Sequence, residues 1–431
     1  MGIPPSTDRL ALLYRVSQAF NSSLDLREVL NRVIDEVIAA TRAERGFLML
    51  RDGDGQLRFR AARGLDQQTI DQPEFQVSRC VVERVAQEGV PLLTSNALRD
   101  QRLSARESVV VLGLRSILCV PLQLKGETIG VIYVDNRLQA GLFNPDDLDL
   151  LTSIASSAAV AIDNARLYQV AVEKGRLERE LQVAREVQTS LLPRETPRLD
   201  GWEFAAYWQP ARQVAGDFYD FIPLTQSEAN GHAGIPQPAQ GLGVVVADVS
   251  DKGMPAALFM ALSRSIVRAS VSRAAAADAG IAQANRLICA DSMNSMFVTL
   301  FYAQIDSGGN LAYVNAGHNP PYLYRTGEDR LIRLTRTGML LGIDSTATFT
   351  QHSLFAQAGD FVLMYTDGVP EALNAHGEEF GEDRLQRVVL ARRHAPATEI
   401  VAAVRDELDR HIGTTAPFDD STLVIARYVG Q

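Results

Sequence analysis

Two stretches of the chain carry strand-like and helix-like hydrophobic patterns, and a charged helical pattern separates them. In the first stretch, apolar residues recur every three or four positions over 26–38, which predicts an amphipathic helix. Asp25 stands directly before it, where an N-cap residue is favourable. Strand-like runs then predict two β-hairpins, formed by 46–52 with 56–64 and by 116–124 with 127–136. A further helix is expected from Asp146 to Leu167, so this stretch is predicted to be an α+β, sensor-like domain with an antiparallel sheet.

The charged pattern between the two stretches has a narrow apolar stripe with heptad spacing. Its two repeating positions hold Leu167, Lys174, Leu181 and Gln188, and Val170, Leu177, Ala184 and Leu191. This spacing predicts a parallel coiled coil in a homodimer, formed through helix 163–192, with polar core residues that fix the register. The alternative is one long amphipathic helix that packs on its own domain. Pro193 and Pro197 are expected to end the helix.

The second stretch alternates strand-like and helix-like segments. The predicted strands are 202–211, 216–224, 241–253, 296–306, 311–325, 360–368 and 421–429, and the predicted helices are 254–273, 278–293, 381–393 and 397–412. Many strands with paired helices predict two sheets with helices outside them. The Gly/Pro/Gln-rich segment 225–240 is predicted to be a hairpin loop inserted between two strands.

The composition fits folded domains and disfavours binding to nucleic acid. Hydrophobic residues make up 46% and charged residues 22% of the 431 residues, which provides apolar surface for packed cores. The formal net charge is −10, whereas nucleic-acid-binding proteins usually carry a basic surplus. Cys80, Cys119 and Cys289 stand far apart in apolar runs, which disfavours disulfides and thiolate metal sites. No signal peptide and no apolar run of ~18 residues is visible, so we expect a cytoplasmic protein without a membrane segment.

Aspartates at the ends of predicted strands carry the most informative chemistry. The aspartates with this placement are Asp217, Asp248, Asp367, Asp419 and Asp420. Carboxylates at the rim of a core are partly desolvated, and several together repel one another unless a cation joins them. Oxygen ligands without histidine or cysteine favour Mg²⁺ or Mn²⁺ over Zn²⁺. A turn or cap role would explain any one of these aspartates, but the shared placement favours a metal site.

Three segments of the first stretch occur in a characteristic order, namely RAERGFLML, RSILCVPLQLKGETIGVIYVDN and LFNPDDLDLLTSIASSAAVAIDNARLY. In this order they resemble the GAF family of sensory domains over residues 8–168. The resemblance implies a sensor, and the sequence does not name its ligand. The pattern of the cyclic-nucleotide-binding members is matched only in part, by Asn136, Arg137, Phe143, Asp146 and Asp147. We therefore interpret Phe143 as a core residue and the two aspartates as a helix start, where they suit the helix dipole.

A longer ordered series fills the second stretch: EVQTSLLP, VAGDFYDF, VVADVSDKGMPAALFMA, MFVTLFYAQID, VNAGHNPPYLY, MYTDGVPEALN and FDDSTLVIAR. Over about residues 180–428 it resembles the metal-dependent PPM (type 2C) serine/threonine phosphatases, in their SpoIIE/RsbU-like branch. The resemblance implies two divalent metals, Mn²⁺ or Mg²⁺, that activate a water for direct attack on phosphorus. The implied catalytic residues and metal ligands are Asp217, Asp248, Asp367 and Asp419, with the Val249 carbonyl as a further ligand and Asp420 as the alternative to Asp419.

The sequence departs from the wider phosphatase family beside Asp248. Many members have Asp-Gly-His there, and that histidine is a candidate general acid, whereas this chain has Val249-Ser250 after the aspartate. His318 is a candidate substitute, but Gly317-His318-Asn319 also fits a structural turn, which we favour. Lys252 is a candidate phosphate contact, although the Lys-Gly pair fits a helix start equally well.

These patterns and resemblances predict an α+β multidomain chain in three parts: a GAF domain at 8–165, a coiled-coil linker helix at 166–193 and an αββα phosphatase domain at 194–431. The implied function is a signal-regulated phosphatase acting on phosphoserine or phosphothreonine of a protein partner, such as a STAS-type anti-sigma-factor antagonist. The alternative is a catalytically degenerate scaffold that binds a ligand and a partner, and retention of the metal aspartates argues against it. A nucleotidyl cyclase or kinase is disfavoured because no P-loop or Gly-rich nucleotide loop is present.

Overall fold

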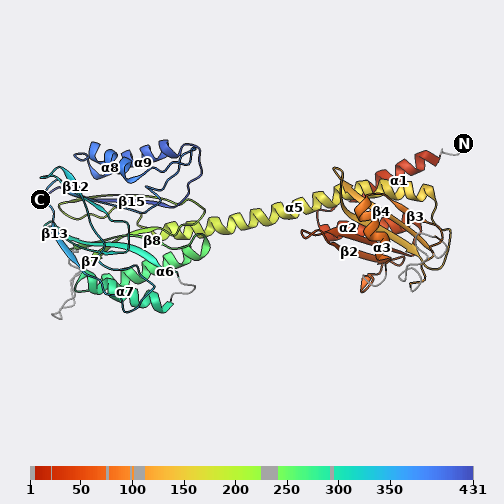
Figure 1. The fold of residues 1–431 in the computed structure, drawn as a ribbon, viewed down its shortest axis with the longest axis horizontal. Coiled ribbons are helices and arrows are strands. Elements are labelled where there is room, and N and C mark those ends of the chain that lie inside the picture. The colour runs from red at the N-terminus through yellow and green to blue at the C-terminus, as the bar shows by residue number, and fades with distance from the viewer. Residues whose placement is uncertain are drawn as a thin grey trace. The chain divides into compact units, whose positions relative to one another are not determined.

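The computed structural model describes residues 5–20, 22–73, 77–97, 100, 112–224, 241–291 and 296–430. The chain divides into two compact units, Met1–Leu177 and Glu178–Gln431. Helix α5 (Pro145–Leu191) begins in the first unit and ends in the second (Figure 1). The predicted inserted loop at 225–240 lies outside the described residues.

The N-terminal unit is built on one five-stranded antiparallel sheet. Its strand order is β2 (Leu57–Gly64), β1 (Arg45–Arg51), β5 (Glu127–Asn136), β4 (Ser116–Leu124) and β3 (Leu92–Thr94). Helices α1 (Pro5–Phe20), α2 (Leu26–Thr41) and the start of α5 pack on one face, and α3 (Arg79–Glu88) packs on the other. Side chains alternate along a strand. Leu48 of β1 therefore lies in the core beneath α1, α2 and α5, whereas Phe47 lies in the core beneath α3.

The local signals predicted in the N-terminal unit are present. The Asp25 carboxylate accepts the Glu28 N–H and caps α2, and the β4–β5 turn has positive φ at both Lys125 and Gly126. The structure adds α1, α3 and β3, which the pattern did not predict. Helix α3 is rich in valine, a weak helix former, so it depends on packing against the sheet rather than on its own propensity.

The C-terminal unit contains two five-stranded antiparallel sheets. The β8 sheet has the order β13 (His352–Phe355), β10 (Asn310–Ala316), β9 (Val298–Asp306), β8 (Gly241–Val249) and β7 (Phe218–Leu224). The β14 sheet has the order β12 (Arg330–Arg333), β11 (Tyr322–Arg325), β14 (Phe361–Tyr365), β15 (Ser421–Tyr428) and β6 (Trp202–Gln209). Side chains from the facing sides of both sheets form one core between them.

Helices cover the outer faces of both sheets and complete four αββα layers, as predicted (Figure 1). Helices α6 (Met254–Val271) and α7 (Ala277–Asp291) pack on the β8 sheet. Helices α8 (Glu382–Ala391) and α9 (Ala397–Ile412) pack on the β14 sheet.

One predicted strand, 311–325, is wrong. It is two strands, β10 and β11, that lie in different sheets. The chain turns between them at Gly317, whose φ is +72°, and at two consecutive prolines, which cannot continue a strand ladder. The edge strands β12 and β13 were not predicted, because each has four residues and little burial to mark it.

Helix α5 changes its surroundings along its length. Its described residues from 166 to 180 are exposed apart from half-buried Gly175. Further on, Leu181 and Ala184 are half-buried, and Gln188 is buried in the C-terminal unit. The helix ends at Leu191, two residues before the predicted proline stop. No helix in the described part of the chain has the length and apolar character needed to cross a membrane.

Candidate active site

Strand ends from both sheets of the C-terminal unit bring the sequence-predicted residues into one cluster. Asp248 and Val249 end β8, and Asp217 directly precedes β7, whose Phe218 pairs with Ala247 of β8. The remaining members stand at the ends of β14 and β15 and are Asp367, Asp419 and Asp420. The charges of Asp367, Asp419 and Asp420 all act on the Asp248 carboxyl. The cluster therefore spans the two sheets at one end of the core.

Asp217 is the most deeply buried member of the cluster. Its Oδ2 accepts hydrogen bonds from Thr366 Oγ1 at 2.6 Å and from Thr422 Oγ1 at 2.8 Å. Burial raises the pKa of this carboxyl well above its ordinary value, and the nearby Asp248 and Asp420 charges raise it further. Both threonines come from the β14 sheet, so they join Asp217 to the opposite layer.

Asp248 is the central carboxyl of the cluster. Burial raises its pKa to about 7, and the charge of Asp367 adds to the effect. The pKa of Asp367 is raised as well, first by burial and then by Asp419. Glu371 belongs to the same negative region, because burial and Asp367 also raise its pKa. Sequence reasoning missed Glu371, which follows the Asp-Gly turn by three residues.

The neighbouring Asp419 and Asp420 have different surroundings. The Asp420 carboxylate accepts the backbone N–H groups of Ala211 and Gly216, both at 2.7 Å, so both of its oxygens hold the loop before β7. Asp419 instead forms an ion pair with Lys252 Nζ at 2.7 Å and remains partly exposed. This division favours Asp419 as the ligand that faces the site and Asp420 as the residue that holds the loop.

Two glycines allow close backbone packing at the cluster. A Cβ built on Gly216 would lie 3.0 Å from the Val249 carbonyl oxygen, so a side chain there would crowd the one backbone ligand that the sequence suggests. A Cβ on Gly368 would lie 1.9 Å from the Asp420 carbonyl oxygen, a distance that no side chain can adopt. Gly368 therefore lets the end of β14 pack against the Asp419–Asp420 segment.

Lys252 brings positive charge to the rim of the cluster. Besides its ion pair with Asp419, its Nζ donates to the Phe418 carbonyl at 3.3 Å and lies 4.5 Å from the centre of the Phe418 ring. The side chain is partly exposed. It is therefore placed to meet an anionic substrate as well as to neutralise Asp419.

His318 is a buried structural residue. Its Nε2 lies 3.1 Å from the Tyr365 carbonyl oxygen, which can only accept, so this nitrogen carries the proton. Its Nδ1 then accepts from the Thr299 hydroxyl at 2.9 Å. Because both ring nitrogens are used and the residue is 1% exposed, it has no free position for proton transfer to a substrate. The favoured turn role agrees with the positive φ of Gly317.

The cluster suits metals that keep several waters. Within the described ranges, no group of three or more His, Cys, Asp or Glu side chains is arranged to hold a metal ion by itself. The donors are carboxylate and carbonyl oxygens, which suit Mg²⁺ and Mn²⁺. Gly216 has no side chain to crowd the Val249 carbonyl oxygen. The carboxylates around Asp248 repel one another and need positive charge. These residues therefore fit divalent metals held by few protein ligands.

Comparison with known proteins identifies both units. The family profile described as "Stage II sporulation protein E (SpoIIE)" matches residues 238–429, and the GAF domain profile matches residues 23–163. The chain contains a GAF domain and a SpoIIE/PPM phosphatase domain. The SiaA-PP2C domain of Pseudomonas aeruginosa is similar in fold, with a TM-score of 0.50 and 20% identity over 60% of this chain and 99% of that one.

Two curated relatives match more than half of the chain. Protein IcfG of Synechocystis sp. (strain ATCC 27184 / PCC 6803 / Kazusa) is 34% identical over 57% of this chain and 41% of its own length. Phosphoserine phosphatase RsbU of Bacillus subtilis (strain 168) is 27% identical over 58% of this chain and 70% of its own length. The chain therefore spans less than half of the first relative and about two thirds of the second.

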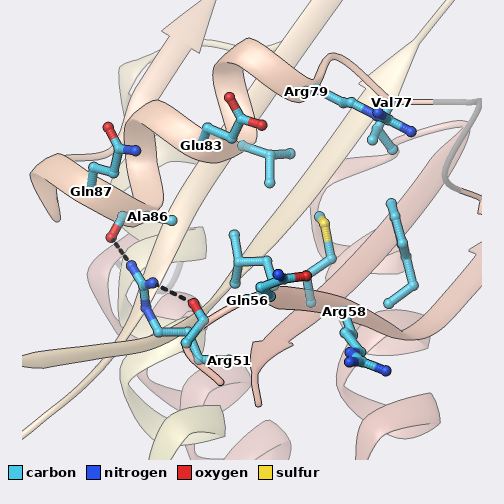
Figure 2. A pocket seen from close by; sticks show the side chains of 13 residues that line it. Arg51, Gln56, Arg58, Val77, Arg79, Glu83, Ala86 and Gln87 are labelled. Carbon is cyan, nitrogen blue, oxygen red and sulfur yellow. Dashed lines mark hydrogen bonds between the residues drawn. The ribbon is translucent and has the colours of Figure 1, made fainter. Parts of the chain in front are cut away.

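The GAF domain has a pocket of about 750 Å³ between the β1–β2 hairpin and α3 (Figure 2). Its apolar lining residues include Met49 and Phe59. Arg51 is committed to the fold, because its guanidinium donates to the carbonyl oxygens of Gly55, Ala86 and Thr128. Figure 2 also labels Arg79 and Glu83, two α3 residues of opposite charge that line the pocket. The charged residues that line the pocket are Arg51, Arg58, Arg79 and Glu83, so this candidate sensor site carries an excess of positive charge.

The other predictions for the GAF domain concern single residues. Phe143 is buried in the core, as expected, and Asn144 caps α5 by accepting the N–H groups of Asp146 and Asp147. All three cysteines are free, and Cys119 is fully buried. Burial raises the pKa of the Cys119 thiol, which favours its role as a small core residue.

Proposed function

We propose that this chain is a metal-dependent protein serine/threonine phosphatase whose active site is the aspartate cluster. The observation that carries the proposal is the convergence of aspartates from the ends of β7, β8, β14 and β15 in a domain of the SpoIIE/PPM family. The proposed metal ligands and catalytic residues are Asp217, Asp248, Asp367 and Asp419, with the Val249 carbonyl as a further ligand.

The residues have separate roles in the proposed reaction. Divalent metals, when bound, supply Lewis-acid activation of water and neutralise phosphoryl charge. Asp248 interacts with Asp217 as well as with the charges of Asp367 and Asp419, so it would suit a ligand position shared by both metals. Asp217 is fixed by its two threonines and therefore holds its ligand position with little freedom. Lys252 attracts and orients the phosphate at the rim, and His318 takes no part in proton transfer.

The proposed substrate is phosphoserine or phosphothreonine on a protein partner. The similar protein RsbU is named a phosphoserine phosphatase, which supports this substrate class. A STAS-type anti-sigma-factor antagonist is the partner suggested by the resemblance to the RsbU-like branch. A folded partner can reach the site because Lys252 and Asp419 lie at the partly exposed rim.

Control by the GAF domain is part of the proposal. Helix α5 carries exposed apolar residues in its linker segment, among them Leu167, Val170 and Leu177. We propose that this stripe pairs with the same stripe of a second copy and that GAF ligand binding alters the pairing. The proposed division is a GAF domain at 8–165, a linker at 166–193 and a phosphatase domain at 194–431.

The function is tested by hydrolysis of p-nitrophenyl phosphate and of a phosphoserine peptide with Mn²⁺ and with Mg²⁺. Asp248→Asn is expected to lower the metal-dependent rate by at least about a hundredfold, since it removes the proposed bridging charge. Asp306→Asn is the matched control, because Asp306 ends β9 at the opposite end of the same sheet. It is expected to leave the rate unchanged.

Two results would contradict the phosphatase proposal. One is a metal-dependent rate that Asp248→Asn leaves unchanged. The other is a wild-type chain that hydrolyses neither substrate with either metal and binds neither metal, and this result would favour the scaffold alternative.

A further inference from the structure

An exposed aromatic side chain stands at the rim of the aspartate cluster. Phe418 directly precedes Asp419 in the chain and is 56% exposed. Its backbone carbonyl accepts from Lys252 Nζ at 3.3 Å, and the same nitrogen lies 4.5 Å from the centre of its ring. Lys252 also forms the 2.7 Å ion pair with Asp419. The ring is therefore held between the proposed phosphate contact and a proposed metal ligand, while more than half of its surface stays open to solvent.

The position of Phe418 distinguishes it from an ordinary exposed apolar residue. A single exposed phenylalanine needs no explanation by itself. Phe355, for example, is 57% exposed and pairs with Asn310 on β10. That pair lies at the end of the β8 sheet where β8 begins, whereas Asp248 stands where β8 ends. Phe418, by contrast, adjoins the cluster and is restrained by Lys252.

The rim beside Lys252 offers apolar surface to a bound substrate. Met254 begins α6 two residues after Lys252 and is 37% exposed. The aspartates of the cluster repel acidic side chains, so acidic residues next to the phosphate of a substrate are disfavoured. An apolar residue meets no such repulsion, and it gains by covering the open surface of the Phe418 ring.

The geometry of phosphoserine brings its neighbours to this rim. Its side chain is short, and the Cα atoms of consecutive residues are only about 3.8 Å apart. When the phosphate reaches the aspartate cluster, the residues on either side of the phosphoserine must therefore lie at the rim. Phe418 is fixed there by Lys252, so it can form a contact without first being ordered.

We propose that Phe418 is a specificity-determining residue that packs against an apolar side chain next to the phosphoserine of the protein substrate. This inference rests on the proposed function, because it names the kind of sequence that the same site accepts. Lys252 meets the phosphate, and the open surface of the Phe418 ring selects the neighbouring residue.

The test compares two phosphoserine peptides of equal length and charge with the full chain and Mn²⁺. One peptide has leucine on both sides of the phosphoserine, and the other has asparagine, which is similar in size but polar. We expect the wild type to prefer the leucine peptide by about tenfold in kcat/KM. The preference is expected in KM rather than in kcat, since the contact does not involve the reacting atoms.

Substitutions of Phe418 separate an apolar contact from a structural role. Phe418→Gln is expected to bring the ratio of the two kcat/KM values close to one, whereas Phe418→Leu, which keeps an apolar side chain, is expected to retain most of the preference. Phe355→Gln is the matched control, because it makes the same change at an equally exposed phenylalanine far from Asp248. It is expected to keep the wild-type ratio.

Each outcome bears on a different claim. Equal hydrolysis of the two peptides by the wild type would overturn the inference. A wild-type ratio in Phe418→Gln would also overturn it, even if both rates fell, because an equal loss indicates that Phe418 only holds Lys252 or Asp419. If the wild type hydrolysed neither peptide with Mn²⁺ or Mg²⁺, the phosphatase function itself would be wrong, and the inference would be wrong with it.

Discussion

His318 illustrates how a residue beside the aspartate cluster can serve the fold alone. Its ring accepts from Thr299 in the β8 sheet and donates to Tyr365 in the β14 sheet, so it joins the two sheets in its neutral form. Burial lowers the pKa of this imidazole from 6.5 to about 4, because a charged ring would lose its hydration, and the positive charge of Arg336 adds to the effect.

This burial predicts a pH dependence of stability. The folded pKa is below the unfolded one, so the contribution of His318 is complete above pH 6.5 and is lost as pH falls towards 4. The expected loss is about 3 kcal/mol of unfolding free energy over this window. Urea unfolding at several pH values measures it, with His318→Gln as the comparison. A variant with the same slope as the wild type between pH 4 and 6.5 would exclude the neutral-histidine explanation.

Sequence alone could predict a site residue only where that residue adjoins a strand with a visible hydrophobic pattern. The aspartates were predictable because each adjoins a hydrophobic strand whose end is visible in the pattern. The partners of Asp217 were not, because Thr366 and Thr422 reach it across more than a hundred residues of chain through pairing that no local pattern encodes. Gln188 was predicted only as a coiled-coil core position. Its hydrogen-bond partner Ala215 lies outside the helix, and no local pattern reveals that contact.

At the scale of elements, long segments with a clear period were predicted well. Strands β4 and β5 and helix α9 have the predicted bounds. Short elements failed, as α3, β12 and β13 did, because tertiary packing rather than local pattern determines them. The split of 311–325 into two strands follows from turn chemistry at Gly317 and the two prolines.

Linker helix α5 gives a prediction of its own. Leu177 is 56% exposed within the stripe, so Leu177→Asp removes an apolar core position of the proposed coiled coil without disturbing a core of the single chain. We expect it to weaken dimerisation by at least about tenfold in sedimentation or light-scattering titrations. Val172→Asp is the matched control, because Val172 is also exposed but stands off the stripe. A monomeric wild type, or equal effects of both changes, would contradict the coiled coil.

At the scale of the whole molecule, each unit has its own cores. The N-terminal unit buries both faces of one sheet, and the C-terminal unit buries a core between its two sheets as well as one on each outer face. Cooperative unfolding is a property of such cores, so a chain with two compact units is expected to unfold in two steps.

Calorimetry tests this expectation and the metal site together. Mn²⁺ at about a hundred times its Kd is expected to raise one of two transitions by about 5 to 10 °C and to leave the other unchanged. Asp248→Asn should abolish the shift, because it removes a proposed ligand. A single transition, or a shift of both, would show that the units are energetically coupled.

The unbroken 47-residue helix has a consequence for how such chains could be recombined. One residue inserted before Gln188 would turn the upstream stripe by about 100° relative to it, whereas seven would leave it within about 20° of its present orientation. A different sensor domain joined to this C-terminal domain would therefore keep the stripe and Gln188 in phase when the two linkers differ by seven or eleven residues. With linkers of other lengths, the exposed stripe would face a different direction relative to Gln188, whose side chain is hydrogen-bonded to Ala215.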